Sequence, residues 1–265
     1  MTTIFVSIDG VRPDALLAAD CPHINGLRQR GAWTFKARSV MPSITLPCHM
    51  STFHSAPPSR HGITTNDWQP MARPLPGLVE QVNAANGKAA FFYNWDPLRN
   101  LCTPLQLHFS YFRNNTYSDL ENGDKVIATE AVRYMASDNP DFVFVYLSTA
   151  DTAGHMYSWM SEGYLQQVER VDAAFGVLLA GITAGSTLLV HSDHGGHERT
   201  HGTDSPEDMS IPWLIMGPGI RQGHEIETAV SLLDTAPTLA AIMDIPVHRD
   251  WEGHCISEIF ETNHS

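Results

Sequence analysis

The sequence predicts an α/β fold, in which a single domain has a mainly parallel central sheet with helices on both faces. Apolar runs typical of buried strands alternate along the chain with longer segments of helical periodicity, which is the arrangement of βαβ units. The chain has 265 residues, of which 43% are hydrophobic and 17% charged, enough for one large globular domain with its own core. No internal repeat or low-complexity linker divides the chain. We therefore expect residues 1–265 to form one domain.

The strands are predicted from short apolar runs that end at polar or turn-forming residues. Residues 3–8 and 142–147 are continuous runs of this kind, and a polar loop follows each of them. Further runs predict strands at 88–93, 187–190 and 213–216.

The helices are predicted from apolar spacing and from residues that begin or end helices. Pro13 suits the first turn of a short helix, and apolar residues recur every three or four positions from Tyr164 to Leu178. Similar signals predict helices at 22–31, 75–85, 119–137 and 232–243. Residues 100–115 are aromatic-rich and lack periodicity, so we expect an irregular surface excursion there.

Composition narrows the classes of partner and the location. A net charge of −13 argues against binding to a nucleic-acid backbone, although bound divalent cations would still let a small anionic substrate enter a site. No apolar run is long enough to span a membrane. Strand-like residues follow the first three positions directly, without the basic and apolar regions of a signal peptide, which predicts a cytoplasmic protein.

Three aspartates follow predicted strands. Asp9 directly follows the predicted strand 3–8, and Asp193 comes shortly after the predicted strand 187–190. Asp151 lies in the loop behind 142–147. An aspartate in such a place is often only a helix cap or a turn former. However, sites in open α/β sheets form beyond the carboxyl ends of strands, so these three carboxylates are expected to meet.

Histidines and a threonine complete the candidate set. His155 lies four residues after Asp151, His194 is adjacent to Asp193, and His201 follows shortly afterwards. Asp and His ligands suit zinc, and a carboxylate-rich site also takes manganese. Thr45, which lies between two prolines, offers a hydroxyl that a cation could activate as a nucleophile. Together, these residues have the composition of a two-metal site with a covalent nucleophile.

The order of these motifs resembles the alkaline phosphatase superfamily, and most closely its nucleotide pyrophosphatase/phosphodiesterase branch. The resemblance spans nearly the whole chain and includes the closing segment 212–219 and the segment 233–238. It rests on Ser7-Ile8-Asp9-Gly10, Thr45-Leu46-Pro47-Cys48-His49, His61-Gly62-Ile63-Thr64-Thr65-Asn66, Asp151-x-x-Gly154-His155, Ser192-Asp193-His194-Gly195 and His201-Gly202.

The resemblance implies a role for each matching residue. One metal ion would be held by Asp9, Asp193, His194 and the Thr45 oxygen, and a second by Asp151, His155 and His201. Both ions would most simply be Zn²⁺, with Mn²⁺ as the alternative.

The substrate contacts follow in the same way. Asn66 would donate its amide to a phosphoryl oxygen, together with the backbone N–H of Thr45. Leu46 and Tyr146 match positions that flank the leaving-group pocket. An aromatic residue is often found at the position of Leu46, so Leu46 departs from the pattern.

Two further departures matter. Superfamily sulfatases have Cys or Ser where this chain has Thr45, which argues against a sulfatase. His201 follows Asp193 by only eight residues, so the long insertion that phosphodiesterase relatives carry before the last histidine is missing. His197 lies in the same stretch and is a rival third ligand of the second metal. The Gly202 that follows His201 favours His201, because it would let the backbone fold close to the site.

The resemblance implies a metal-dependent phosphoric ester hydrolase that acts on a small-molecule phosphate ester through a phosphothreonine on Thr45. Asn66 is a neutral donor, which suits the single negative charge of a diester, so we expect a phosphodiesterase of the nucleotide pyrophosphatase type. The alternative within the superfamily is a phosphomonoesterase or phosphonate hydrolase. A hypothesis of another class is a non-catalytic protein that binds metal or phosphate on the same scaffold.

Overall fold

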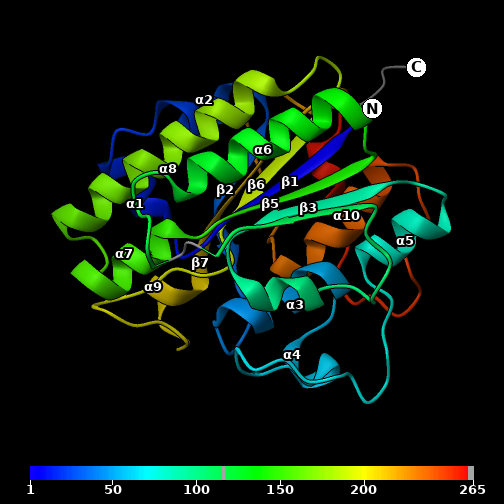
Figure 1. The fold of residues 1–265 in the computed structure, drawn as a ribbon, viewed down its shortest axis with the longest axis horizontal. Helices are drawn as coiled ribbons and strands as arrows, with labels where there is room; N and C mark the ends of the chain where they lie inside the picture. The colour runs from blue at the N-terminus through cyan, green and yellow to red at the C-terminus, as the bar shows by residue number, and fades with distance from the viewer. Residues whose placement is uncertain (115–116, 262–265) are drawn as a thin grey trace.

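A computed structural model describes residues 1–114 and 117–261 of the chain. Within these residues, one sheet of eight strands forms the centre of the molecule, in the order β4-β3-β5-β1-β6-β7-β2-β8 (Figure 1). Its strands are β1 (Thr3–Ile8), β2 (Ala32–Arg38), β3 (Ala89–Tyr93), β4 (Phe109–Phe112), β5 (Phe142–Leu147), β6 (Thr187–His191), β7 (Ser210–Met216) and β8 (His224–Glu225). Only β7 pairs antiparallel with its neighbours, so the sheet is mainly parallel, as the sequence predicts.

Helices cover both faces of the sheet. Figure 1 shows α2, α6 and α8 along one face and α3 and α10 along the other. The first face is packed by α1 (Pro13–Ala18), α2 (Pro22–Arg30), α6 (Gly123–Asp138) and α8 (Glu162–Gly181). The second is packed by α3 (Thr45–His54), α5 (Leu78–Ala84) and α10 (Thr235–Ile242). The single α/β domain with helices on both faces is thereby confirmed.

Most predicted elements are present with small shifts at their ends. The strand predicted at 142–147 is β5, and the helix predicted at 22–31 is α2. The helix predicted at 75–85 begins later, at Leu78, because the two prolines at positions 74 and 76 and Gly77 precede its first turn.

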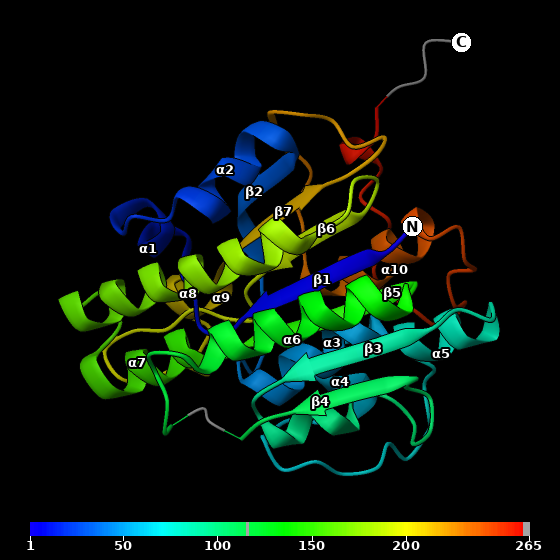
Figure 2. The ribbon, with the colours of Figure 1, turned by 45° about the horizontal axis from the view of Figure 1, so that its top comes forward.

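Several elements were missed. Phe109–Phe112 forms the edge strand β4, whereas the sequence predicted an irregular excursion over 100–115, of which residue 115 lies outside the described residues (Figure 2). β4 is largely exposed on both sides, so it has no alternation of apolar and polar residues to detect. β2 was missed as well, and so was helix α3, whose first residue is Thr45.

The carboxyl ends of three neighbouring strands bring distant parts of the sequence together. β1 lies between β5 and β6, with Ile8 beside Leu147 and Ser7 beside His191. The helix α7 (Thr149–Tyr157) follows β5, and the short helix α9 (Pro206–Met209) closes the loop after β6. The candidate residues therefore gather at this end of the sheet. Among the described residues, no helix has both the length and the apolar character needed to cross a membrane.

Candidate functional site

Three buried carboxylates meet beyond the ends of β1, β5 and β6. Asp9 follows β1, Asp151 lies in the first turn of α7, and Asp193 follows β6. One oxygen of each carboxylate has no hydrogen-bond partner among the described residues, namely Oδ1 of Asp9, Oδ1 of Asp151 and Oδ2 of Asp193. Buried charged oxygens without partners are costly unless a cation is present, so this donor set fits a bound metal.

The electrostatics of the three carboxylates point the same way. Burial and the neighbouring carboxylates Asp193 and Asp151 raise the pKa of Asp9 well above its usual value. Burial, and then the charge of Asp151, raise the pKa of Asp193 to about 8. Burial also raises the pKa of Asp151. Like charges held this close in a low dielectric repel one another, and a divalent cation between them would reverse the sign of the local field.

Three histidines have their Nε2 atoms turned toward these carboxylates. The Nδ1 of each ring is hydrogen-bonded to a backbone carbonyl: Gly195 for His194 (2.8 Å), Ser43 for His201 (2.8 Å) and Arg199 for His155 (2.9 Å). A carbonyl can only accept, so the proton sits on Nδ1 and the Nε2 lone pair is left for a ligand. Second-sphere hydrogen bonds of this kind are usual for metal-binding histidines.

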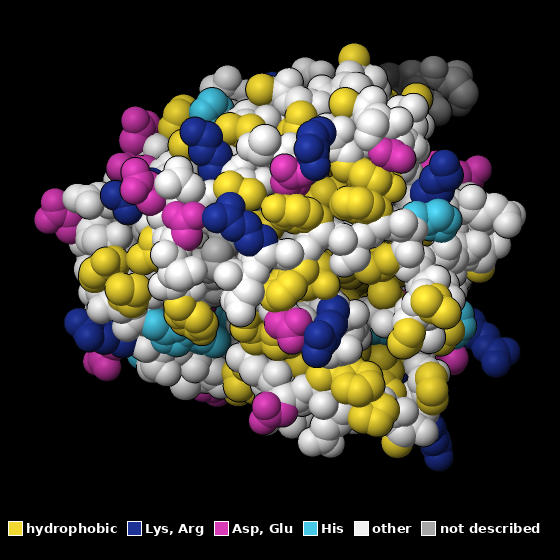
Figure 3. Space-filling view, in the orientation of Figure 1, with side chains coloured by type: hydrophobic (Ala, Val, Ile, Leu, Met, Phe, Trp, Pro, Cys, Tyr) yellow, Lys and Arg dark blue, Asp and Glu magenta, His cyan; other side chains and the backbone are white. Residues whose placement is uncertain are grey.

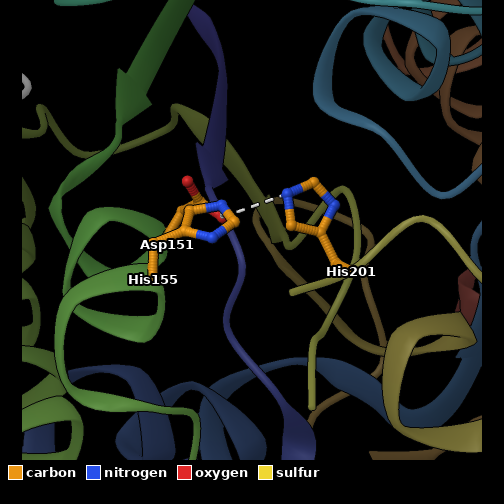
Figure 4. Close-up of side chains that lie close together, drawn as sticks. All are labelled: Asp151, His155 and His201. Atoms are coloured by element: carbon orange, nitrogen blue, oxygen red, sulfur yellow. Dashed lines mark ion pairs between the residues drawn. The ribbon is translucent and has the colours of Figure 1, made fainter. Parts of the chain in front are cut away.

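The donor atoms form two overlapping groups. One consists of Asp151, His155 and His201, whose donor atoms lie within 4.8 Å of one another. In Figure 4 the first two residues come from α7, while His201 approaches from the facing loop. The Oδ1 atom of Asp151 lies 3.5 Å from Nε2 of His155 and 3.6 Å from Nε2 of His201. Histidine side chains are also visible at the surface in the lower left of Figure 3, over the region of α7 and α9.

The second group is buried more deeply. It consists of Asp9, Asp151 and His194, again with donor atoms within 4.8 Å of one another. The Nε2 atom of His194 lies 3.2 Å from Oδ1 of Asp9 and 3.4 Å from Oδ2 of Asp193. Asp151 thus lies between the two groups, whereas the resemblance placed it with the second metal alone.

His197, the rival of His201 as a third ligand, contacts a different carboxylate. Its Nδ1 lies 2.7 Å from Oδ1 of the buried Asp208, and its backbone pairs with Thr200. Asp208 also accepts hydrogen bonds from the N–H and hydroxyl of Thr203. This geometry favours His201 over His197 as a third ligand beside Asp151.

Thr45 and Asn66 lie next to the buried group. Thr45 is the first residue of α3, and its hydroxyl lies 3.3 Å from Nε2 of His194. The N-terminus of a helix carries partial positive charge, which favours an anion beside this hydroxyl. The exposed Asn66 accepts a hydrogen bond from the backbone N–H of Leu46 through Oδ1 (3.0 Å), which holds its amide beside the start of α3.

The side chains of Leu46 and Tyr146 do not reach the surface of the site. Leu46 is 0% exposed and Tyr146 is 1% exposed. Tyr146 donates its hydroxyl to Oδ2 of Asp9, so it contacts a carboxylate of the candidate site; the resemblance matched it to a position that flanks the leaving-group pocket. The exposed Tyr117 was not predicted. Partial burial raises the pKa of its hydroxyl, and so do the charges of Asp151 and Asp9.

Trp159 is a second residue that the sequence did not reveal. Its indole N–H donates to the carbonyl of Gly10 at 2.8 Å, and its ring lies 5.1 Å from that of His155 and 5.9 Å from that of His201. A Cβ atom on Gly154 or Gly196 would come within 2.5 Å or 2.3 Å of the indole. The sequence signal for Trp159 lay in Gly154 and Gly196, because a glycine beside a candidate ligand allows a neighbouring group to approach the backbone closely.

Comparison with known proteins identifies the family. The family model described as type I phosphodiesterase / nucleotide pyrophosphatase matches residues 3–205. Ectonucleotide pyrophosphatase/phosphodiesterase family member 3 of Mus musculus is 26% identical over 220 residues, which cover 72% of this chain and 24% of that protein. The chain therefore spans about a quarter of the length of that curated relative.

Solved structures share the fold. Human ectonucleotide pyrophosphatase/phosphodiesterase 5 superposes with a TM-score of 0.82 at 15% identity, over 99% of this chain and 100% of that one. A phosphonate monoester hydrolase from Silicibacter pomeroyi superposes with a TM-score of 0.75 at 16% identity, over 100% of this chain and 78% of that one. With the family model matching most of the chain, this protein belongs to the type I phosphodiesterase / nucleotide pyrophosphatase family.

Proposed function

We propose that this chain is a metal-dependent phosphoric ester hydrolase of the phosphodiesterase type, with Thr45 as its nucleophile. One observation carries the proposal: buried oxygens of three aspartates, without partners among the described residues, lie close to the Nε2 atoms of three histidines, and one of these atoms, in His194, is 3.3 Å from the hydroxyl of Thr45. Membership of the family supports the class of reaction. Residues 1–265 would then form one catalytic domain.

The donor set supports two divalent cations, most simply zinc. Asp9, Asp193 and His194, with the Thr45 oxygen, would hold one ion, and Asp151, His155 and His201 the other. Neutral imidazole and carboxylate donors suit Zn²⁺, and Mn²⁺ is the alternative. Burial, and then the proximity of His194, lower the pKa of His201 to about 2, so the imidazole of His201 is neutral and able to bind a metal at neutral pH. When bound, divalent cations lower the pKa of the nucleophile and neutralise the charge that develops on the leaving oxygen.

The residues of the chain would then position the reaction. The oxygen of Thr45 attacks phosphorus as its hydroxyl loses its proton, the bond to the ester oxygen breaks, and that oxygen takes up a proton from solvent and leaves as the alcohol. The phosphoryl group is then carried on Thr45. Water attacks the same phosphorus in a second displacement and frees the threonine hydroxyl. Asn66, held by its bond to Leu46, offers its amide hydrogens to a phosphoryl oxygen, and the N-terminus of α3 faces the same group. Two in-line displacements give net retention of configuration at phosphorus.

We infer a preference for diesters over monoesters. Asn66 is neutral and suits the single charge of a diester, whereas a monoester dianion is usually met by a cationic clamp. The guanidinium of Arg12 is engaged by Asp14 and by the carbonyl of Gly196. The short connection between His194 and His201 removes an insertion that could cover the site, so a phosphomonoesterase or phosphonate hydrolase is the second candidate.

A panel of three esters distinguishes these candidates. We expect kcat/KM to be highest for a thymidine p-nitrophenyl diester, lower for bis-p-nitrophenyl phosphate and lowest for p-nitrophenyl phosphate. The reverse order would replace the diesterase by the monoesterase. Turnover of none of these esters by zinc-loaded protein would favour a non-catalytic metal- or phosphate-binding protein.

Replacement of the nucleophile tests the covalent scheme. Thr45→Ala should reduce turnover by at least about a thousandfold, because the nucleophile and its positioned oxygen are lost together. The zinc content of the variant should remain close to two equivalents. Thr52→Ala is the matched control, since Thr52 is buried in the same helix and its hydroxyl binds the carbonyl of Cys48. Near-normal turnover by Thr45→Ala would rule out the phosphothreonine.

A further inference from the structure

Asp124 is a buried carboxylate outside the candidate site, and its two oxygens accept four hydrogen bonds. It lies in the first turn of α6 and is 4% exposed. Oδ1 accepts from Nδ2 of Asn94 (2.9 Å) and from the backbone N–H of Ser148 (3.0 Å). Oδ2 accepts from the backbone N–H (3.2 Å) and the hydroxyl (2.6 Å) of Thr149. Burial raises the pKa of Asp124, and these donors oppose the rise.

Three of the four donors belong to the first residues of α7. Ser148 is the N-cap of this helix, and its own side chain makes no capping bond. The first N–H groups of a helix have no partner within the helix, so they need acceptors from elsewhere. Asp124 supplies them from another helix. It therefore fixes where α7 begins relative to α6, in addition to stabilising α7.

The start of α7 is held from other sides too. Asn94 follows the end of β3, so its bond to Asp124 ties this network to the sheet. Gln167 of α8 donates to the hydroxyl of Thr149 at 2.7 Å. The first turn of α7 is thus tied to α6, α8 and the sheet.

α7 carries both ligands that the second metal would take from a helix. Asp151 and His155 lie two and six residues after Thr149 on this nine-residue helix. Both move as one body with the helix, so a small rotation of its first turn displaces both donors relative to His201, which is on a separate loop. Metal binding is sensitive to such displacements, because the ligands must meet within a few tenths of an ångström.

We propose that Asp124 is a positioning residue, which sets α7 so that Asp151 and His155 converge with His201 on the second metal. The inference rests on the proposed function, because it assumes that these three residues bind an ion. Asp124 itself touches neither metal nor substrate.

The chain contains a matched control for this role. Asp172 of α8 is 1% exposed and accepts from the backbone N–H groups of His23 (3.1 Å) and Ile24 (2.8 Å). These residues are in the first turn of α2, whose N-cap also lacks a side-chain bond. Asp172 therefore caps a helix from another helix, as Asp124 does, but α2 carries no candidate ligand.

The test compares Asp124→Asn with Asp172→Asn in the full chain. An amide of the same shape replaces one acceptor oxygen by a donor, so each variant should lower Tm. Zinc affinities are measured on metal-stripped protein by competition with a chromophoric chelator. We expect Asp124→Asn to weaken one of the two zinc equivalents by up to about 10- to 100-fold, the range found when a group that hydrogen-bonds a metal ligand is lost. Asp172→Asn should leave both equivalents within about twofold of wild type, because that cap is remote from the ligands.

The outcomes separate this inference from the proposed function. Wild-type affinity for both equivalents in Asp124→Asn would overturn the inference while leaving the two-metal site in place. Equal weakening by Asp124→Asn and Asp172→Asn would also overturn it, because the effect would then be general loss of stability. A wild-type chain that binds no zinc would overturn the proposed function and this inference with it. If Asp124→Asn does not fold, Thr149→Val removes the hydroxyl that donates to Asp124 and accepts from Gln167, and it keeps the backbone N–H that donates to Asp124. This variant should weaken the same equivalent, and no weakening would overturn the inference.

Discussion

The two halves of the candidate site are built differently. Asp9, Asp193 and His194 are carried by the ends of adjacent strands, and the side chain of His194 is 0% exposed. In the other half, Asp151 and His155 are on helix α7 and His201 is on a loop, with the side chain of His155 38% exposed and that of His201 9% exposed. Residues at strand ends are fixed by the pairing of the strands in the sheet. Residues on a helix or a loop need further contacts to fix their positions.

We call Asp9, Asp193 and His194 the inner half of the candidate site, and Asp151, His155 and His201 the outer half. The further contacts surround the outer half. Trp159 fills the space between α7 and the loop of His201, and Asp208 holds the same loop through His197 and Thr203. Asp124 holds the start of α7. The inner half should therefore be rigid and closed to solvent, and the outer half adjustable and accessible.

The largest effects are expected when a histidine of either half is removed, and rescue of activity by added imidazole distinguishes the two halves. His194→Ala and His155→Ala should each lower zinc affinity by at least the roughly 10- to 100-fold that loss of an outer-shell partner costs. Added imidazole should restore part of the activity of His155→Ala, because solvent reaches that position, but not that of His194→Ala, which is buried. The measurement is turnover against imidazole concentration. Equal rescue of both variants would show that the inner half is open.

A second comparison concerns the loop after β6. His201→Ala should lose about one zinc equivalent and most turnover, because two protein ligands are too few for a catalytic zinc. His197→Ala should keep both equivalents and mainly alter KM, since its ring binds Asp208. Metal analysis of the purified variants, together with steady-state kinetics, measures this. Loss of zinc in His197→Ala alone would exchange the two assignments.

Gly10 tests the contact between the two halves, because it follows Asp9 and packs against Asp151. This residue has φ of +68°, and a Cβ atom there would lie 2.9 Å from Cα of Asp151. Gly10→Ala should reduce the free energy of unfolding by about 1–3 kcal/mol through backbone strain, with a further loss from the contact. Urea denaturation measures the change. Gly62→Ala is the control, because Gly62 has φ of +79° but nothing within 4 Å of its Cβ position, so it reports the strain alone.

The smallest effect is expected at the support of the inner half. Tyr146→Phe removes the hydroxyl that donates to Asp9 but leaves the buried ring. Because a cation can still satisfy that carboxylate, we expect a loss of stability of about 1 kcal/mol in the zinc-loaded protein. The metal-stripped protein should lose more, and thermal unfolding with and without zinc compares the two. A large loss of kcat/KM without loss of stability would instead return Tyr146 to the role of substrate contact that the sequence predicted.

The sequence by itself determined the α/β class, most of the strands and the candidate residues Asp9, Asp151 and Asp193. These positions could be predicted because strand runs are local patterns, and because parallel strands bring residues after their carboxyl ends to one edge of the sheet. Even there, β4 escaped prediction, since a short exposed edge strand has no periodicity.

The tertiary structure alone decided how the side chains of the candidate ligands are oriented. The carbonyls of Ser43 and Arg199 fix the rings of His201 and His155 across 158 and 44 residues of sequence. Asp124 meets Thr149 across 25 residues. Local patterns carry no information about such pairs, because each depends on how the helices and loops pack around the finished sheet. The tertiary structure also turns the side chains of His201 and His197, two residues of the same type on one loop, to different carboxylates, Asp151 and Asp208.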